Sequence, residues 1–174
     1  MGLEKKFRLV VFPTELGWVG ILHFNHVIEL ISAGHVRQIE LFEVFRSVDF
    51  DVAEWDATEQ EWVQRFQQFA GGQSVSFDSM KLNLGKVTEF QRRALNVCRQ
   101  IPYGETVSYG ELGEMVGSPR AARAIGSVMK NNRHPWVIPC HRVVASAGVG
   151  GFSSPRGVEL KRQLLRLEKP VGSD

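Results

Sequence analysis

The residues best suited to chemistry in this chain are Cys140 and His141, which stand side by side between Pro139 and Arg142. Thiols react as thiolates, and an adjacent imidazole or positive charge lowers the pKa of a thiol toward neutrality. The sequence therefore predicts a nucleophilic cysteine with a lowered pKa. An isolated Cys-His pair is also compatible with a buried small side chain beside a hydrogen-bonded histidine, so the surroundings must decide between the two interpretations.

The charge of the chain changes sign near its middle. Residues 1–84 carry 7 Lys and Arg against 12 Asp and Glu, a net of −5, whereas residues 85–174 carry 14 against 7, a net of +7. No acidic residue occurs between Glu114 and Glu159, and six basic residues fall there: Arg120, Arg123, Lys130, Arg133, Arg142 and Arg156. A stretch of only positive charge around a candidate nucleophile suits a polyanionic partner such as nucleic acid.

Composition restricts the class of protein. With 174 residues and 43% apolar content, the chain is long enough to bury one moderate core or two small ones. No apolar run approaches the roughly 18 residues of a membrane span, and the run at residues 9–12 is too short for a secretory leader. We therefore expect an intracellular protein, in the nucleus or the cytoplasm, that does not bind membranes.

The remaining cysteine and three of the other histidines do not suggest further chemistry. Cys98 falls on the apolar stripe of a predicted helix and is expected to be structural. His23, His26 and His35 have no cysteine at zinc-ligand spacing and read as ordinary strand or loop residues. We expect no metal site and no cofactor.

The first half of the chain predicts a small α/β domain. Period-two patterns predict strands at 7–12 and 18–24, a third at 27–31 that ends at Ser32-Ala33-Gly34, and a looser one at 75–84. Apolar residues at helical spacing predict helices at about 36–48 and 58–69. No candidate chemistry appears in this half, and its acidic balance argues against a main nucleic-acid surface.

The second half predicts mainly helices. Thr88 and Gln91 form a capping box that opens a helix, Ser108 is expected to cap a helix at 109–116 that Gly117 ends, and Ser118-Pro119 is expected to start another that runs to about Lys130. A helix, a tight glycine turn and a helix with basic residues give the outline of a helix-turn-helix.

The last of these helices is unusually slim. Ile125, Val128 and Met129 are expected to face inward, and the rest of the surface is formed by small residues, Ala121, Ala122, Ala124, Gly126 and Ser127. Small residues allow close approach to a duplex, into which Arg123 would project alone. The alternative, which helix composition alone leaves equally open, is that alanines simply favour the helix and Arg123 is a surface charge.

Residues from about Thr88 to Glu168 resemble the catalytic domain of O6-alkylguanine-DNA alkyltransferases, also called methylated-DNA–protein-cysteine methyltransferases. The shared motifs occur in the family's order: Ile101-Pro102-Tyr103-Gly104-Glu105-Thr106, Ser108-Tyr109-Gly110-Glu111-Leu112, Ala121-Ala122-Arg123-Ala124-Ile125-Gly126, Asn132, Ile138-Pro139-Cys140-His141-Arg142-Val143-Val144 and Leu164-Leu165-Arg166-Leu167-Glu168. The resemblance implies an α/β, ribonuclease-H-like domain at 1–85 and a mainly α DNA-binding and alkyl-acceptor domain with a helix-turn-helix at 86–174.

The resemblance also implies the reaction and its catalytic residues. The alkyl group of O6-alkylguanine, and possibly of O4-alkylthymine, in duplex DNA would pass irreversibly to Cys140, once per protein molecule and without a cofactor. His141, acting through a water and held by Glu168, would take the thiol proton. Tyr109 would donate toward guanine N3, and Asn132 would form the hinge between the recognition helix and the active-site segment.

The same resemblance implies the binding residues. The DNA-binding residues would be Arg123, as a finger that fills the gap left by the extruded base, together with Ala122, Gly126, Ser118, Arg120 and Lys130. The alkyl pocket would be lined by Pro135, Trp136, Val143, Gly150 and Ser153. The expected partner is double-stranded DNA that carries the lesion, and the protein is expected to act as a monomer.

Two departures and three alternatives accompany this interpretation. Phe152 stands where many family members have tyrosine, and Trp136 is bulky where an aliphatic residue is usual; either would change which alkyl groups fit. A cysteine hydrolase with Cys140, His141 and Glu168 would share the nucleophile but needs an oxyanion hole. A lesion-binding relative without repair would be expected to lack the thiol, and a transcription regulator would need an effector or dimerisation module, which the sequence does not suggest.

Overall fold

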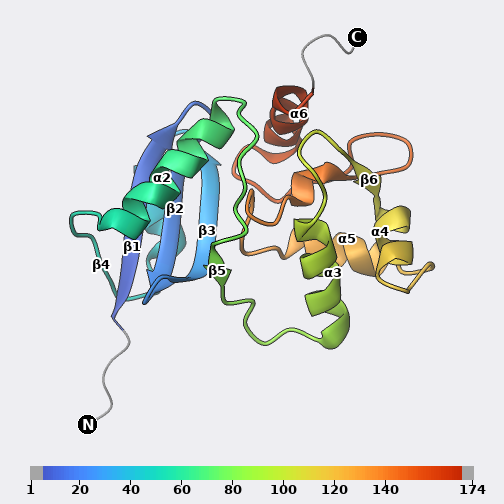
Figure 1. Cartoon of the computed structure of the whole chain (residues 1–174), viewed down its shortest axis with the longest axis horizontal. Coiled ribbons are helices and arrows are strands. Elements are labelled where there is room, and N and C mark those ends of the chain that lie inside the picture. Colours follow the sequence, from blue (N-terminus) through green and yellow to red (C-terminus); the bar gives the residue numbers. More distant parts are fainter. Residues whose placement is uncertain (1–5, 170–174) are drawn as a thin grey trace. The chain divides into compact units, whose positions relative to one another are not determined.

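The computed structural model describes residues 6–169, and the chain divides into two compact units after Asn83. The first unit contains a sheet and two helices, and the second is mainly helical (Figure 1). The expected α/β first part and mainly α second part are therefore observed. No helix within residues 6–169 has the length and apolar character that crossing a membrane requires.

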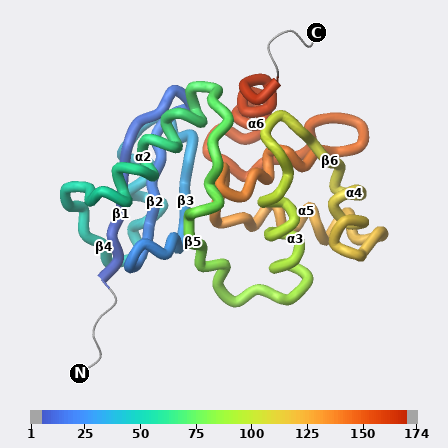
Figure 2. Tube along the Cα trace, in the orientation of Figure 1, coloured from blue at the N-terminus to red at the C-terminus, as the bar shows by residue number. Residues whose placement is uncertain are grey.

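The sheet of the first unit has five strands in the order β4-β1-β2-β3-β5. Strands β1 (Phe7–Thr14), β2 (Gly17–Phe24) and β3 (Val27–His35) form an antiparallel meander, visible in blue in Figure 2. The two-residue strands β4 (Phe50–Asp51) and β5 (Lys81–Leu82) extend it in parallel on either edge.

Alternation along β1 explains why each face of the sheet carries one helix. Leu9 packs in a cluster with residues of α1 (Ile39–Phe45). Phe12, three residues later and on the opposite face, packs edge-on against Phe66 of α2 (Ala57–Ala70), with 5.8 Å between the ring centroids. Successive strand side chains point to opposite faces, so the two apolar sets read from the sequence separate into two layers.

Three predicted elements of this unit need correction. The third strand continues past Ile31 to His35, because Gly34 (φ +85°) is accommodated in a β-bulge between Trp18/His35 and Val19/Ala33. The helix predicted at 36–48 spans only α1. The strand predicted at 75–84 is reduced to β5, because its apolar residues Phe77 and Met80 are buried through a turn rather than along a ladder.

A buried ionic network joins β1, β2 and α2, and sequence reasoning missed it. Glu59, which is fully buried, accepts hydrogen bonds from Arg8 at 2.7 Å on both oxygens and from His23 Nε2 at 2.8 Å. Glu59 also completes a capping box with Asp56, whose carboxylate is bound by His26. His23 lies in β2 and His26 in the turn that follows it, as expected, and their hydrogen bonds to Glu59 and Asp56 connect the start of α2 to the sheet.

The second unit begins with α3 (Glu89–Arg99), whose capping box of Thr88 and Gln91 is present as predicted. Next come α4 (Tyr109–Met115), capped by Ser108 and ended by Gly117 at φ +75°, and α5 (Ala122–Lys130). The unit ends with α6 (Gly157–Leu167).

The predicted start of α5 at Ser118-Pro119 is wrong. Residues 118–121 form a turn in which the Ala121 amide donates to the Ser118 carbonyl, and the helix begins at Ala122. The carbonyl of Ser118 lies against Gly113 of α4, where an added Cβ would come within 3.0 Å. This close approach of backbone to helix fixes the turn and overrides the local helix-start signal.

A two-residue parallel ladder connects the elements that matter for the site. Strand β6 (Val107–Ser108) pairs with β7 (Val143–Val144), Val107 opposite Val143 and Ser108 opposite Val144. Because β6 runs directly into α4 and β7 directly follows Cys140–Arg142, the ladder places Tyr109 beside the cysteine segment.

Candidate active site

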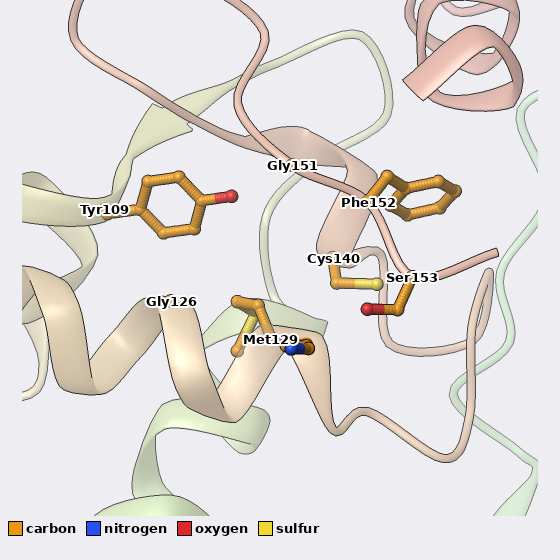
Figure 3. A pocket seen from close by; sticks show the side chains of 8 residues that line it. Tyr109, Gly126, Met129, Cys140, Gly151, Phe152 and Ser153 are labelled. Atoms are coloured by element: carbon orange, nitrogen blue, oxygen red, sulfur yellow. The ribbon is translucent and has the colours of Figure 1, made fainter. Parts of the chain in front are cut away.

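Cys140 lies at the first position of a 3-10 turn, Cys140–Arg142, and is 7% exposed. Its thiol borders a pocket of about 290 Å³ that is lined by Tyr109, Gly126, Met129, Lys130, Cys140, Gly151, Phe152 and Ser153. Figure 3 shows the Tyr109 hydroxyl directed toward the middle of the view and the Cys140 sulfur directed toward the Ser153 side chain. The pocket thus offers a thiol to a small ligand that enters between α5 and the segment around Gly151.

Asn132 connects the end of α5 to the nucleophile. Its side-chain amide donates to Cys140 Sγ at 3.2 Å and to the Ile138 carbonyl at 2.9 Å, while its oxygen accepts from the His134 amide at 3.0 Å. Three hydrogen bonds made by one side chain therefore hold in place the segment that precedes Cys140.

The predicted lowering of the Cys140 pKa is wrong for this state of the protein. Burial raises the pKa of the thiol above its ordinary value, and the hydrogen bond from Asn132 and the charge of Lys161 oppose this rise only in part. The charge of neighbouring Arg142 is already paired with Glu168 at 2.8 Å. The resting thiol is therefore protonated, and its reaction requires a base.

The candidate base is His141, which is fully buried. Its Nε2 donates to Glu168 Oε1 at 2.7 Å. Burial lowers the pKa of His141, although the hydrogen bond to Glu168 acts in the opposite direction. A neutral imidazole whose one nitrogen is bound by a carboxylate is suited to accept a proton at the other.

Glu168, which directly follows α6, is held by more partners than the sequence suggested. Arg142 donates to both of its oxygens, at 2.8 and 2.9 Å, and the Gly104 amide donates at 3.2 Å. Burial alone would raise the pKa of Glu168, but the hydrogen bonds from His141 and Arg142 outweigh it and lower the pKa to about 2. Arg142 was predicted to be one of the charges that face a polyanion, but it forms an ion pair with this buried carboxylate.

Tyr109, at the start of α4, forms another side of the pocket. Burial raises the pKa of its phenol, and the proximity of Cys140 raises it further. The phenol is therefore protonated and is available as a hydrogen-bond or proton donor. Gly150 lies directly against this ring, since an added Cβ would be 3.1 Å from the Tyr109 hydroxyl.

The residues predicted to bind DNA fall on the outer side of α5 and on the turn before it. Ala122, Arg123, Ala124, Ser127 and Lys130 are exposed, whereas Ile125, Val128 and Met129 are buried, as predicted from their spacing. Arg120 is also exposed, and Ser118 is half-buried. Gly126 and Lys130 line the pocket as well, so α5 joins the exposed face to the nucleophile.

The predicted pocket residues are placed differently. Ser153 lines the pocket and Gly150 supports it through Tyr109. Val143 and Trp136 are instead buried, at 0% and 1% exposure, and Pro135 is half-buried, bridged to Ile138 and not among the lining residues. Trp136 therefore acts in the core of the unit (φ +71°) and not as a wall of the pocket.

Sequence reasoning did not find Lys161 of α6, which is fully buried and donates to the Val143 and Gly151 carbonyls. A signal was present, because Lys161, Leu164 and Glu168 share one face of a helix at spacings of three and four. Among residues 6–169, no group of three or more His, Cys, Asp or Glu side chains is arranged to hold a metal ion.

Residues 89–170 match the family described as 6-O-methylguanine DNA methyltransferase, DNA binding domain. A methylated-DNA–protein-cysteine methyltransferase of Methanosarcina acetivorans is 40% identical over 108 residues, which span 60% of this chain and 65% of that relative. The alignment therefore covers slightly less than two thirds of that relative's length.

Solved structures extend the similarity over both units. The O6-methylguanine methyltransferase of Mycobacterium tuberculosis is 29% identical, with a TM-score of 0.74 and 95% of each chain covered. A second structure, of Mycobacterium tuberculosis OGT in complex with DNA, is 29% identical, with a TM-score of 0.74, 94% of this chain and 92% of that chain covered. Residues 89–170 therefore carry a 6-O-methylguanine DNA methyltransferase DNA-binding domain, and the chain is similar over both units to solved O6-methylguanine methyltransferases.

Proposed function

We propose that this protein repairs DNA by direct reversal: it transfers the alkyl group of O6-alkylguanine, and of O4-alkylthymine where that base fits, to Cys140. The observation that carries the proposal is the position of the Cys140 thiol in a pocket that is continuous with the slim helix α5. Similarity to a protein crystallised in complex with DNA supports duplex DNA as the partner.

The lesion must leave the base stack before a thiol can reach it. Flipping a nucleotide costs about a few kcal/mol, least for a damaged base. In this proposal α4 and α5 act as a helix-turn-helix with α5 against the duplex, and Arg123 occupies the space that the base vacates. Ser118, Arg120, Ala122, Gly126 and Lys130 would contact the backbone or permit its close approach.

The proposed reaction uses the pocket residues Cys140 and Tyr109 together with the buried His141 and Glu168. The Cys140 proton passes through a water to His141, whose imidazolium is stabilised by Glu168. The thiolate attacks the alkyl carbon, the carbon–oxygen bond breaks, and the electron pair stays on guanine O6. Tyr109 gives a proton to guanine N3 and regains one from His141, so one proton moves in total from thiol to guanine.

The product explains why each molecule acts once. A thioether has no leaving group that water displaces at neutral pH, so Cys140 stays alkylated. Ser153 and the amides near it would contact guanine O6, and Gly150 would keep Tyr109 in place.

The first unit, a sheet with α1 and α2 on opposite faces, is proposed to have the ribonuclease-H-like arrangement implied by the resemblance.

The decisive experiment is intact-mass spectrometry after mixing the protein with a duplex that contains one O6-methylguanine. We expect one adduct of about +14 Da, a methyl in place of a proton, on Cys140 and without turnover. Cys98→Ala, which removes the other thiol, should be alkylated to the same extent, and Cys140→Ala should bind the lesion but remain unmodified. Repeated turnover would favour the cysteine-hydrolase alternative.

A further inference from the structure

We infer that Ser32, His35 and Glu40 form a second nucleophilic site, in which the Ser32 hydroxyl accepts an acyl group from small activated esters. All three residues lie in the first unit, so the site neither uses Cys140 nor depends on the proposed repair reaction. The sequence predicted no chemistry in this unit. The inference rests on the register of the sheet and on two polar contacts of His35.

A β-bulge brings Ser32 and His35 to the same face of the sheet. Residues three apart on a regular strand point to opposite faces. In β3 an extra residue, Gly34 with φ +85°, shifts the register next to the pair of Trp18 and His35 and restores the alternation. Leu30, two residues before Ser32, and Trp18, opposite His35, both pack against the apolar cluster that includes residues of α1. Both side chains therefore lie on the face that carries α1.

His35 lies between the other two side chains. Its Nε2 is 2.6 Å from Ser32 Oγ, and its Nδ1 is 3.5 Å from Oε2 of Glu40, which belongs to the first turn of α1. An ionised carboxylate only accepts hydrogen bonds, so the ring proton belongs on Nδ1, and Nε2 is left to accept the hydroxyl hydrogen of Ser32. An imidazole that a carboxylate orients in this way activates a hydroxyl as a nucleophile.

Both partners of Ser32 have the ionisation state that this role requires. Burial lowers the pKa of His35, which is 4% exposed, and the carboxylate of Glu40 opposes this effect only in part, so the ring is neutral at pH 7. Arg37 donates to Oε1 of Glu40 at 3.1 Å and lowers the pKa of this carboxyl. The site thus combines a neutral base with an anion that fixes its tautomer.

The hydroxyl is open to a small reagent. Ser32 is half-buried, and residues 36–38, which connect β3 to α1, are exposed. An ester that carries a good leaving group needs less stabilisation of its oxyanion than a peptide or an alkyl ester does. Small activated esters are therefore the class of substrate that this site would take.

The acyl transfer is balanced by the groups of the site and the ester. The oxygen of Ser32 forms a bond to the carbonyl carbon while its proton passes to His35, whose imidazolium faces Glu40. The bond from that carbon to the leaving oxygen then breaks, the electron pair departs with the oxygen, and the proton leaves His35 for that oxygen or for water. One ester and one hydroxyl become one acyl-serine and one alcohol or phenol.

The test is peptide mapping after the protein has reacted with 4-nitrophenyl acetate. Cleavage after Lys and Arg places Ser32 and Ser47 on separate peptides, 9–37 and 47–65, and each is the only serine of its peptide. We expect an adduct of about +42 Da, an acetyl in place of a proton, to form on Ser32 about 100-fold faster than on the exposed Ser47. His35→Gln should remove this difference, and the matched control Ser47→Ala should leave the rate at Ser32 unchanged.

Nitrogen NMR of the wild type tests the arrangement without any ester. At pH 7 the ring of His35, assigned by its loss in His35→Gln, should carry its proton on Nδ1 and have an unprotonated Nε2. Glu40 acts through His35 and is therefore a positioning residue. Glu40→Gln should slow acetylation of Ser32 about tenfold and raise the population of the other tautomer, which a purely structural role would not change.

Acetylation of Ser32 no faster than that of Ser47 in the wild type would overturn the inference, as would a proton on Nε2 of His35. Neither result depends on whether a variant folds. Fast acetylation that persisted in His35→Gln would also overturn it, because the histidine would then not be the base. Failure of methyl transfer to Cys140 would refute the proposed function and leave the result at Ser32 unaffected.

Discussion

Arg142 donates to both carboxylate oxygens of Glu168, at 2.8 and 2.9 Å. Glu168, the hydrogen-bond partner of the candidate base His141, is therefore itself held by a buried bidentate ion pair. Arg142 also donates to the Ile101 carbonyl at 2.6 Å. The arginine of the Pro-Cys-His-Arg motif is therefore part of the support for His141 and not part of a surface for DNA.

Removing Arg142 should destabilise the protein strongly. In Arg142→Met the carboxylate of Glu168 stays buried without its main counter-charge, and loss of one partner of a buried pair costs about 3–5 kcal/mol. Urea unfolding of the variant and of the exposed control Arg162→Met measures the difference in free energy. A loss below about 1 kcal/mol would show that the pair contributes little.

Acid should unfold the protein partly through Glu168. The pKa of this carboxyl is lowered in the folded state to about 2 from 4.5. The stability that it contributes is fully present above pH 4.5 and is lost as the pH falls toward 2, and it amounts to at most about 3 kcal/mol. The free energy of unfolding of Glu168→Gln should therefore be nearly independent of this titration, whereas that of the wild type falls. Parallel curves for the two proteins would contradict the assignment.

Local signals in the sequence predicted those parts of the fold that depend on a few adjacent residues. The predicted capping box at Thr88 and the predicted cap at Ser108 depend on four adjacent residues each, and both are present. Ser118-Pro119 has an equally strong signal but failed, because contact with Gly113 decides the conformation there. His23 looked ordinary since its partners, Glu59 and the rest of the network, lie far along the chain.

The residues of the candidate site also differ in how far local sequence could predict them. Cys140 and His141 were found because they are adjacent and chemically distinctive, whereas Tyr109, Asn132 and Glu168 were named only through the resemblance. The sequence shows neither that Arg142 is buried nor that Lys161 lies beneath the pocket. A count of charged residues along the sequence does not distinguish exposed from buried side chains. Only the packing of the folded chain shows that Arg142 and Lys161 are buried.

Gly150 should be required for the position of Tyr109. It has φ +75°, and an added Cβ would lie 3.1 Å from the Tyr109 hydroxyl and 3.2 Å from the Ala145 amide nitrogen. Gly150→Ala should therefore displace the ring and lower the rate with O6-benzylguanine about tenfold or more. Gly148→Ala is a matched control, since Gly148 also has positive φ but an added Cβ there meets no atom within 4 Å. Equal rates for the two variants would show that backbone strain, and not contact with Tyr109, causes the loss.

Arg123 should matter only when the substrate is a duplex. If it fills the space of an extruded base, Arg123→Ala should slow repair of duplex O6-methylguanine about 100-fold, in line with a flipping cost of a few kcal/mol. Reaction with free O6-benzylguanine should remain within about threefold of the wild type, because no gap has to be filled. Comparable losses on both substrates, measured as single-turnover rates, would contradict the role of a finger.

The distance along the chain between the base and its partner has a consequence for biosynthesis. His141 and Glu168 are 27 residues apart, and chains are synthesised at about 5–20 residues per second, so about 1–5 s separate the two on the ribosome. During that interval the thiol of Cys140 exists without the carboxylate that orients its base, and without α6 and its lysine. The nascent protein should therefore become reactive only when α6 and Glu168 have been made and have docked.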